Sequence, residues 1–110
     1  MKKLLSILLL SFFIVGSVFA DKAYDYFQKG DYKSAVREWT KLANQGKAVA
    51  QYNLGLQYAN GRGVTKDYKQ AFKWYLKSAN QGYSSAQNNL GTLYTQGRGV
   101  TKDYKQANSW

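Results

Sequence analysis

The chain of 110 residues contains no cysteine, no histidine and no proline, and only 6 acidic residues. Without cysteine it can form no disulfide, so an exported form would hold its fold by packing alone. Without cysteine and histidine it also lacks the usual thiolate nucleophiles, general bases and metal ligands. The absence of proline suits helices joined by glycine turns. Together these absences argue against a metal site, a cofactor and an enzymatic activity.

The few carboxylates give no catalytic pair. Asp31, Asp67 and Asp103 each stand where a helix is expected to begin, and a carboxylate there caps free backbone amides. The remaining acidic residues are Asp21, Asp25 and Glu38. These are scattered along the first unit and indicate no acid–base pair. Gly61-Arg62-Gly63 is no phosphate loop, because it follows a predicted helix rather than a strand and lacks the third glycine.

What the chain has in excess is positive charge. It carries 16 Lys and Arg, and the net charge is +10. Without Lys2 and Lys3 the balance is still +8. An exported protein with this charge is attracted to anionic envelope polymers or to acidic partner proteins. The alternative is that the lysines lie on solvated helix faces and only aid solubility. Nucleic acid is not expected as a partner, because an export signal takes the chain away from it.

The N-terminus predicts that signal. Met1-Lys2-Lys3 is followed by a mostly apolar run from Leu4 to Phe19, and Ala20 precedes the charged Asp21. This pattern predicts a signal peptide over residues 1–20, cleaved after Ala20, and a periplasmic or secreted protein with no stable membrane span after cleavage. The alternative is an uncleaved anchor, but the run is shorter than the roughly 20 residues that a span needs.

The rest of the chain repeats itself. Residues 61–71 recur unchanged at 97–107, an offset of 36 residues, and 18 of the 25 positions in 50–74 are identical in 86–110. An earlier unit with the same offset pairs Asp31-Tyr32 with Asp67-Tyr68. A fixed period of this length is typical of stacked repeats rather than of one closed core. The units predicted are 21–49, 50–85 and a truncated 86–110.

The pattern within each unit predicts a pair of helices. Apolar residues four apart, Ala50, Leu54 and Tyr58, predict a helix over about 49–60 with a copy over 85–96. A second helix should begin at Asp67, capped reciprocally by Gln70, and end near a C-cap at Gly82. In the first unit the helices expected are 22–29 and 32–45. The fold class predicted is therefore all-α: a right-handed α-solenoid of antiparallel helix pairs with about two and a half repeats.

Two kinds of repeated residue have expected structural roles. Gly55 offers no side chain, so a neighbouring helix can approach closely there. Arg62 and Arg98 follow the first helix of their units, where the helix dipole favours a cation. The aromatic residues expected in the core between helices are Tyr58, Trp74, Tyr75 and Tyr94.

The motif Ala-x3-Leu-Gly-x2-Tyr-x2-Gly-x-Gly-Val-x2-Asp-x3-Ala-x2-Trp-Tyr-x3-Ala-x2-Gly-x3-Ala runs from Ala50 to Ala86. It resembles the Sel-one-like repeat, a relative of the tetratricopeptide repeat, and the first unit looks closer to tetratricopeptide spacing. The resemblance implies an adaptor that holds other proteins or peptides. Some exported relatives have paired cysteines and are linked to β-lactam binding or hydrolysis; this chain has no cysteine, so that activity is not carried over.

Differences between the two similar units suggest a binding face. Tyr52 becomes Asn88 and Leu56 becomes Thr92, opposite the fixed apolar stripe of the helix. By resemblance to tetratricopeptide arrays, this face lines a concave groove, to which we add Phe27. In such repeats an asparagine at the position of Asn88 hydrogen-bonds a peptide backbone. The alternative is drift on an unconstrained surface, which gives the same scatter.

The function expected is a non-enzymatic, exported scaffold that binds a protein or peptide partner through this concave face. One alternative is a basic envelope protein that binds an anionic cell-wall or outer-membrane polymer. Another is a truncated array with no role of its own. The sequence ends one residue into the expected Trp-Tyr pair, at Trp110, so self-association through an open C-terminal end is also expected.

Overall fold

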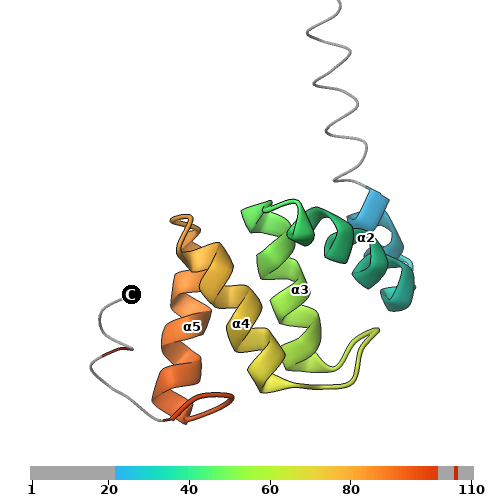
Figure 1. The fold of residues 1–110 in the computed structure, drawn as a ribbon. Helices are drawn as coiled ribbons and strands as arrows, with labels where there is room; N and C mark the ends of the chain where they lie inside the picture. The colour runs from blue at the N-terminus through green and yellow to red at the C-terminus, as the bar shows by residue number, and fades with distance from the viewer. Residues whose placement is uncertain (1–21, 102–105, 107–110) are drawn as a thin grey trace, which may run out of the picture.

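The computed structural model describes residues 22–101 and Gln106. In this part of the chain the regular secondary structure consists of helices, which are joined by loops (Figure 1). A helical segment at 22–28 is followed by α2 (Tyr32–Asn44), α3 (Ala48–Asn60), α4 (Tyr68–Ala79) and α5 (Ser84–Gln96). Each helix begins and ends within one residue of its expected bounds, except α4, which ends at Ala79, before the expected cap at Gly82. The all-α solenoid is confirmed. The predicted signal peptide and the C-terminal end expected to self-associate lie outside the described residues.

The helices follow one another as hairpins in a row. The closest packing is between α3 and α4, and α2–α3 and α4–α5 pack on either side. Figure 1 shows α3, α4 and α5 side by side, with α2 at one end of the row. None of the described helices is both long enough and apolar enough to cross a bilayer.

The helix starts follow local rules, with one correction. The carboxylate of Asp67 accepts hydrogen bonds from the amides of Lys69 and Gln70 at 3.0 and 3.2 Å, so Asp67 caps α4 as expected. The reciprocal half of the cap is wrong. The amide of Asp67 donates instead to the carbonyl of Tyr58 at 2.9 Å, so α3 itself satisfies it. The helix start is thus tied to the preceding helix rather than to its own third residue.

The helix ends need one further correction. Gly61 has φ +66° and caps α3 in the left-handed region, as its position predicted. At the end of α4 the capping residue is Asn80, not Gly82. Gly82, with φ +86°, lies two residues later in the turn, where its amide donates to the carbonyl of Ala79 at 2.9 Å.

The core is divided between two clusters that meet along α3 and α4. One holds Trp39, Leu54 and Trp74; the other holds Tyr75 and Leu90. The expected aromatic core is confirmed: Trp74 is 7% exposed and Tyr75 2%. Tyr58 and Tyr94 are partly buried against these clusters.

Gly55 allows the close approach that its lack of a side chain predicted. A Cβ atom at Gly55 would lie 2.6 Å from two ring carbons of Tyr75. The buried tyrosine of α4 therefore packs directly on the backbone of α3. This contact explains why α3 and α4 pack more closely than the other pairs of described helices.

Each glycine-bracketed loop also touches the unit before it. The guanidinium of Arg62 lies over the rings of Phe27 and Tyr32, at 5.2 and 5.7 Å from their centroids. One unit later Arg98 lies 5.0 Å from the centroid of the Tyr68 ring and donates to its hydroxyl at 3.1 Å. Both arginines follow a helix C-terminus, as expected, but they also join successive units through cation–π contacts.

Candidate binding groove

A hollow of about 470 Å³ opens between α3 and α5. From α3 it is lined by Leu56, Ala59 and Asn60, and from α5 by Asn89, Thr92, Leu93 and Gln96. Its other lining residues are Tyr75 of α4 and, near the glycine loops, Lys66, Tyr68 and Arg98. The hollow therefore combines apolar side chains with amide and hydroxyl groups that can donate and accept hydrogen bonds.

The two helices that form its walls carry no charge. Neither α3 nor α5 contains an Asp, Glu, Lys or Arg residue, whereas α4 contains three lysines. Among the described residues, the charged side chains that line the hollow are Lys66 and Arg98, which come from the loops at one end. A ligand lying between α3 and α5 would meet neutral hydrogen-bonding groups along most of its length and cations at that end.

At the cationic end of the hollow, Lys66 and Arg98 both lie against the ring of Tyr68. The ammonium of Lys66 lies 5.0 Å from the centroid of the Tyr68 ring, and the guanidinium of Arg98 reaches the same ring from the next unit. A hydrogen bond with Lys66, and secondarily the charge of Arg98, lower the pKa of Tyr68. Among the described residues the ion pairs are Lys29–Asp25 and Lys41–Glu38, so neither cation here has a carboxylate partner within that part of the chain.

The structure brings together two of the residues predicted to bind. Leu56 of α3 and Thr92 of α5 line the same hollow from opposite walls. Asn88 is exposed beside it, and its carbonyl accepts a hydrogen bond from the hydroxyl of Thr92 at 3.1 Å. The asparagine that lines the hollow is its neighbour, Asn89.

The other two predicted residues lie elsewhere. The ring of Tyr52 is half-buried, with its centroid 5.9 Å from that of Tyr75 and 5.2 Å from that of Tyr83. Phe27 packs one unit earlier, 5.7 Å from Trp39. Tyr52 therefore packs against Tyr75, which lines the hollow, and Phe27 belongs to the joint between the first two units.

A second hollow of about 240 Å³ repeats this arrangement one unit earlier. Its lining residues are Tyr24, Trp39, Leu42, Lys47, Val49, Ala50 and Asn53. Trp39 precedes Tyr75 by 36 residues, and Asn53 precedes Asn89 by the same number. Each hollow thus has a buried aromatic residue of one helix and an asparagine of the next. The earlier hollow is the more apolar, and Tyr24 and Val49 at its edge are 55% and 54% exposed.

Sequence reasoning missed Asn89, Lys66 and Arg98. Asn53 and Asn89 are identical in the two units, so a search for positions that differ passes over them. The signal that could have found Asn89 is position on the helix: it is one residue, or 100°, from Asn88. Lys66 and Arg98 lie in loops, where helix position gives no signal.

The described residues contain no group of three side chains suited to hold a metal ion. The titratable groups at the main hollow are Lys66, Tyr68, Tyr75 and Arg98. Within residues 22–101 and Gln106, this set provides cations and hydrogen-bond donors but no carboxylate or imidazole to act as a base. The chemistry that this arrangement favours is recognition.

Comparison with known proteins agrees with the repeat geometry. The family model for the Sel1 repeat matches residues 48–83 and 84–110. No curated protein sequence matches the chain.

The solved structures that resemble it include two proteins with the same repeat. A protective antigen of uropathogenic Escherichia coli strains, which displays an SLR fold, is 41% identical with a TM-score of 0.76; the match covers 80% of this chain and 20% of that one. A Sel1 repeat protein from Oxalobacter formigenes is 34% identical with a TM-score of 0.76; the match covers 84% of this chain and 37% of that one. The chain thus spans well under half the length of either protein.

Proposed function

We propose, from the premise that the chain belongs to the Sel1 repeat family, that it binds a protein or peptide segment in the groove between α3 and α5. Sel1 repeats are in general non-enzymatic scaffolds for protein–protein interaction. An extended segment of the partner lies along the concave face of the chain. The scaffold need not rearrange to receive this segment.

The observation that carries this proposal is the chemistry of the hollow between α3 and α5. Asn60, Asn89 and Gln96 reach it from both walls, and amide side chains can satisfy both the N–H and the C=O groups of a peptide backbone. Leu56 and Leu93 supply apolar surface between them. A groove with paired amides and no charge on its walls fits a main chain better than it fits a charged small molecule.

Blocking the groove should abolish this recognition. We expect peptides selected from a random displayed library to bind the variant Thr92→Arg at least about tenfold more weakly than the wild type, because a long charged side chain would fill the space between the walls. Isothermal titration calorimetry with the selected peptides measures the effect.

The matched control is Thr65→Arg, which adds the same side chain at an exposed position outside the hollow. It should bind within about twofold of the wild type. Equal weakening by both variants, or peptides that are enriched yet ignore Thr92→Arg, would show that the groove is not the binding site.

We also propose that the chain is exported after cleavage behind Ala20. The support is the pattern of a basic start, an apolar run and small residues before Asp21. We expect the protein recovered from the envelope or medium of an expressing bacterium to begin at Asp21, as read by intact mass and N-terminal sequencing. The variant Ala20→Arg should leave the precursor uncleaved. A full-length N-terminus on the wild-type protein would contradict the proposal.

A further inference from the structure

The lysines and arginines on the second helix of each unit form two rows. On α2 they are Lys33, Arg37 and Lys41; on α4 they are Lys69, Lys73 and Lys77. Within each row the residues are four apart, so their side chains follow one another along one side of the helix. The two rows correspond residue by residue at the 36-residue offset of the repeat. We call them the basic rows.

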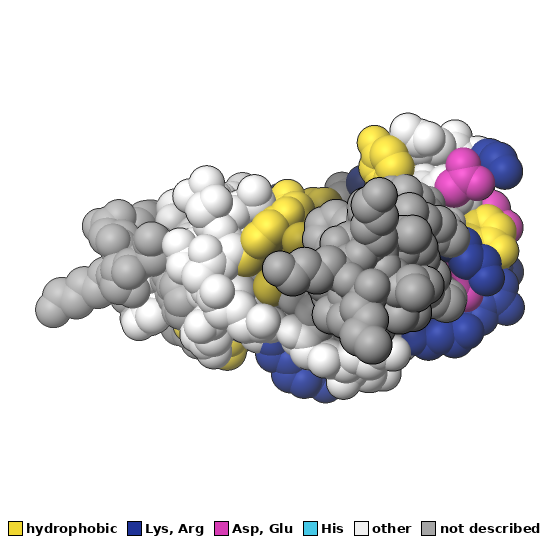
Figure 2. Space-filling model, turned by 90° about the horizontal axis from the view of Figure 1, so that it is seen from above, with side chains coloured by type: hydrophobic (Ala, Val, Ile, Leu, Met, Phe, Trp, Pro, Cys, Tyr) yellow, Lys and Arg dark blue, Asp and Glu magenta, His cyan; other side chains and the backbone are white. Residues whose placement is uncertain are grey.

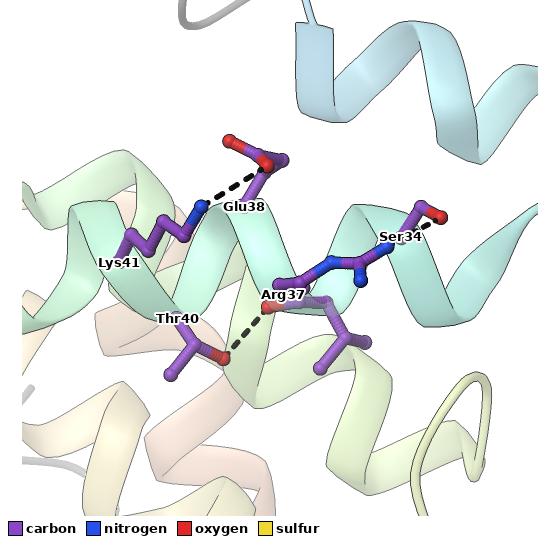
Figure 3. A network of polar contacts seen from close by, with 6 residues as sticks. Ser34, Arg37, Glu38, Thr40 and Lys41 are labelled. Carbon is purple, nitrogen blue, oxygen red and sulfur yellow. Dashed lines mark hydrogen bonds and ion pairs between the residues drawn. The ribbon is translucent and has the colours of Figure 1, made fainter.

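The basic rows point away from the core. All six residues are exposed, whereas Ala35 and Trp39 on α2, and Ala71 and Tyr75 on α4, are buried on the opposite side. Figure 3 shows Arg37 and Lys41 on the outer side of α2. There Arg37 donates to the hydroxyl of Ser34 at 3.0 Å.

Compensating negative charge is unevenly distributed. On α2 the ammonium of Lys41 lies 3.5 Å from a carboxylate oxygen of Glu38, and the face seen in Figure 2 has acidic side chains at the end of the molecule that carries α2. The sequence of α4 contains no acidic residue. Its row of three lysines has no ion pair among the described residues. The row on α4 therefore has less compensating charge than the row on α2: Asp67 precedes the helix, but its carboxylate caps the first turn.

This array disfavours the helix that carries it. Like charges four residues apart repel each other, and each row contains two such pairs. On α4 two of the ammonium groups share one aromatic ring: Lys73 and Lys77 lie 5.5 and 4.8 Å from the ring centroid of Trp74. Solubility alone does not require three cations aligned on one side of a helix, so the alignment points to an anion outside the protein.

We infer that the basic rows bind a linear acidic polysaccharide, a polymer with a carboxylate on its successive sugars. Such a polymer offers negative groups at short, regular intervals, which matches cations spaced by one helical turn. A membrane surface fits less well, because the exposed large apolar residues among those described, Tyr24 and Val49, line the second hollow and do not belong to the rows. Single-stranded nucleic acid needs exposed rings for stacking, whereas Trp74 is only 7% exposed.

This surface is separate from the groove proposed above. The groove is formed by α3 and α5, and none of the six residues of the rows lines either hollow. The protein would therefore hold a partner on one face while the opposite face rests on an acidic glycan. The inference does not depend on the peptide-binding proposal, and the two can fail independently.

The test uses alginate, a soluble polymer of uronic acids, and the purified protein at low ionic strength. We expect the triple variant Lys69→Gln/Lys73→Gln/Lys77→Gln to bind alginate about tenfold more weakly than the wild type, because three charge contacts are lost. The matched control Lys22→Gln/Lys29→Gln/Lys47→Gln removes the same charge elsewhere and should bind within about twofold of the wild type. Replacing the same three α4 lysines with arginine should preserve binding.

Three results would overturn the inference: no binding of alginate by the wild type, equal loss in the two glutamine triples, or tighter row-dependent binding to duplex DNA or to vesicles of anionic phospholipid. The variant Thr92→Arg separates the two surfaces, since it should lose the selected peptides and retain alginate. Circular dichroism of each triple checks that the helices are intact, which is expected because all the replaced lysines are exposed.

Discussion

Replacing Gly63 by alanine is expected to lower the free energy of unfolding by about 3 kcal/mol. Two causes add. Gly63 has φ +75°, where an alanine is strained by about 1–2 kcal/mol. A Cβ atom there would also lie 2.5 Å from the carbonyl oxygen of Tyr32 and 3.0 Å from the amide nitrogen of Lys33. Because these are backbone atoms in the first turn of α2, no side-chain rotation can relieve the overlap.

The chain provides a control that isolates the second cause. Gly30 has a similar φ of +81°, but a Cβ atom built on it has nothing within 4 Å. Gly30→Ala should therefore cost only the backbone strain, about 1 kcal/mol. Urea unfolding followed by far-ultraviolet circular dichroism measures both variants. If both variants lost the same free energy of unfolding, the loop at Gly63 would not contact α2 in solution.

The result would bear on how the array is held together. The same contact occurs one unit later, where a Cβ atom at Gly99 would meet the carbonyl oxygen of Tyr68. In a stacked array each unit is stabilised by its own packing and by the joint with its neighbour. The second glycine of each loop allows that joint to close, and the arginine before it covers the ring of the preceding unit. Gly63→Ala thus measures how much the contact between neighbouring units stabilises the protein, rather than the packing within one unit.

The repeat explains why so much of this fold could be predicted. An offset of 36 residues, with capping residues and glycines at fixed places, determines where helices begin and end without knowledge of the tertiary structure. The close approach at Gly55 followed from the absence of a side chain. What failed was local detail decided by distant atoms: the amide of Asp67 donates to Tyr58 in the preceding helix, which no rule for a single helix end includes.

The groove was harder to predict because some of its residues differ between the repeat units and others are identical in them. Positions that differ between the units led to Leu56 and Thr92, which do line the hollow. The same criterion excludes Asn89 and Arg98, which are identical to Asn53 and Arg62. Identity between units reflects the repeated architecture, and the architecture itself forms part of the hollow. Helix angle relative to the neighbouring unit, rather than variation, would have selected Asn89; Arg98 lies in the loop after α5, where that criterion does not apply.

Raising the pH should destabilise the protein through one buried phenol. Burial raises the pKa of Tyr75 from 10.0 to about 12, and a hydrogen bond with Asn89 opposes that rise. Below about pH 10 the phenol is neutral in both states and affects nothing. Between about pH 10 and pH 12 the unfolded chain releases this proton while the folded chain retains it, so the unfolded state becomes favoured. We expect Tyr75 to account for a loss of about 2–3 kcal/mol by about pH 12.

The variant Tyr75→Phe isolates this contribution from the loss of lysine charge, which both proteins share. Its free energy of unfolding, relative to the wild type, should rise by about 2–3 kcal/mol between about pH 9 and pH 12. The matched control is Tyr24→Phe, whose ring is 55% exposed and therefore loses little water on folding. Parallel pH profiles for wild type and Tyr75→Phe would mean that the ring reaches solvent. In that case Tyr75 would not form the closed floor on which Leu56 and Thr92 face each other.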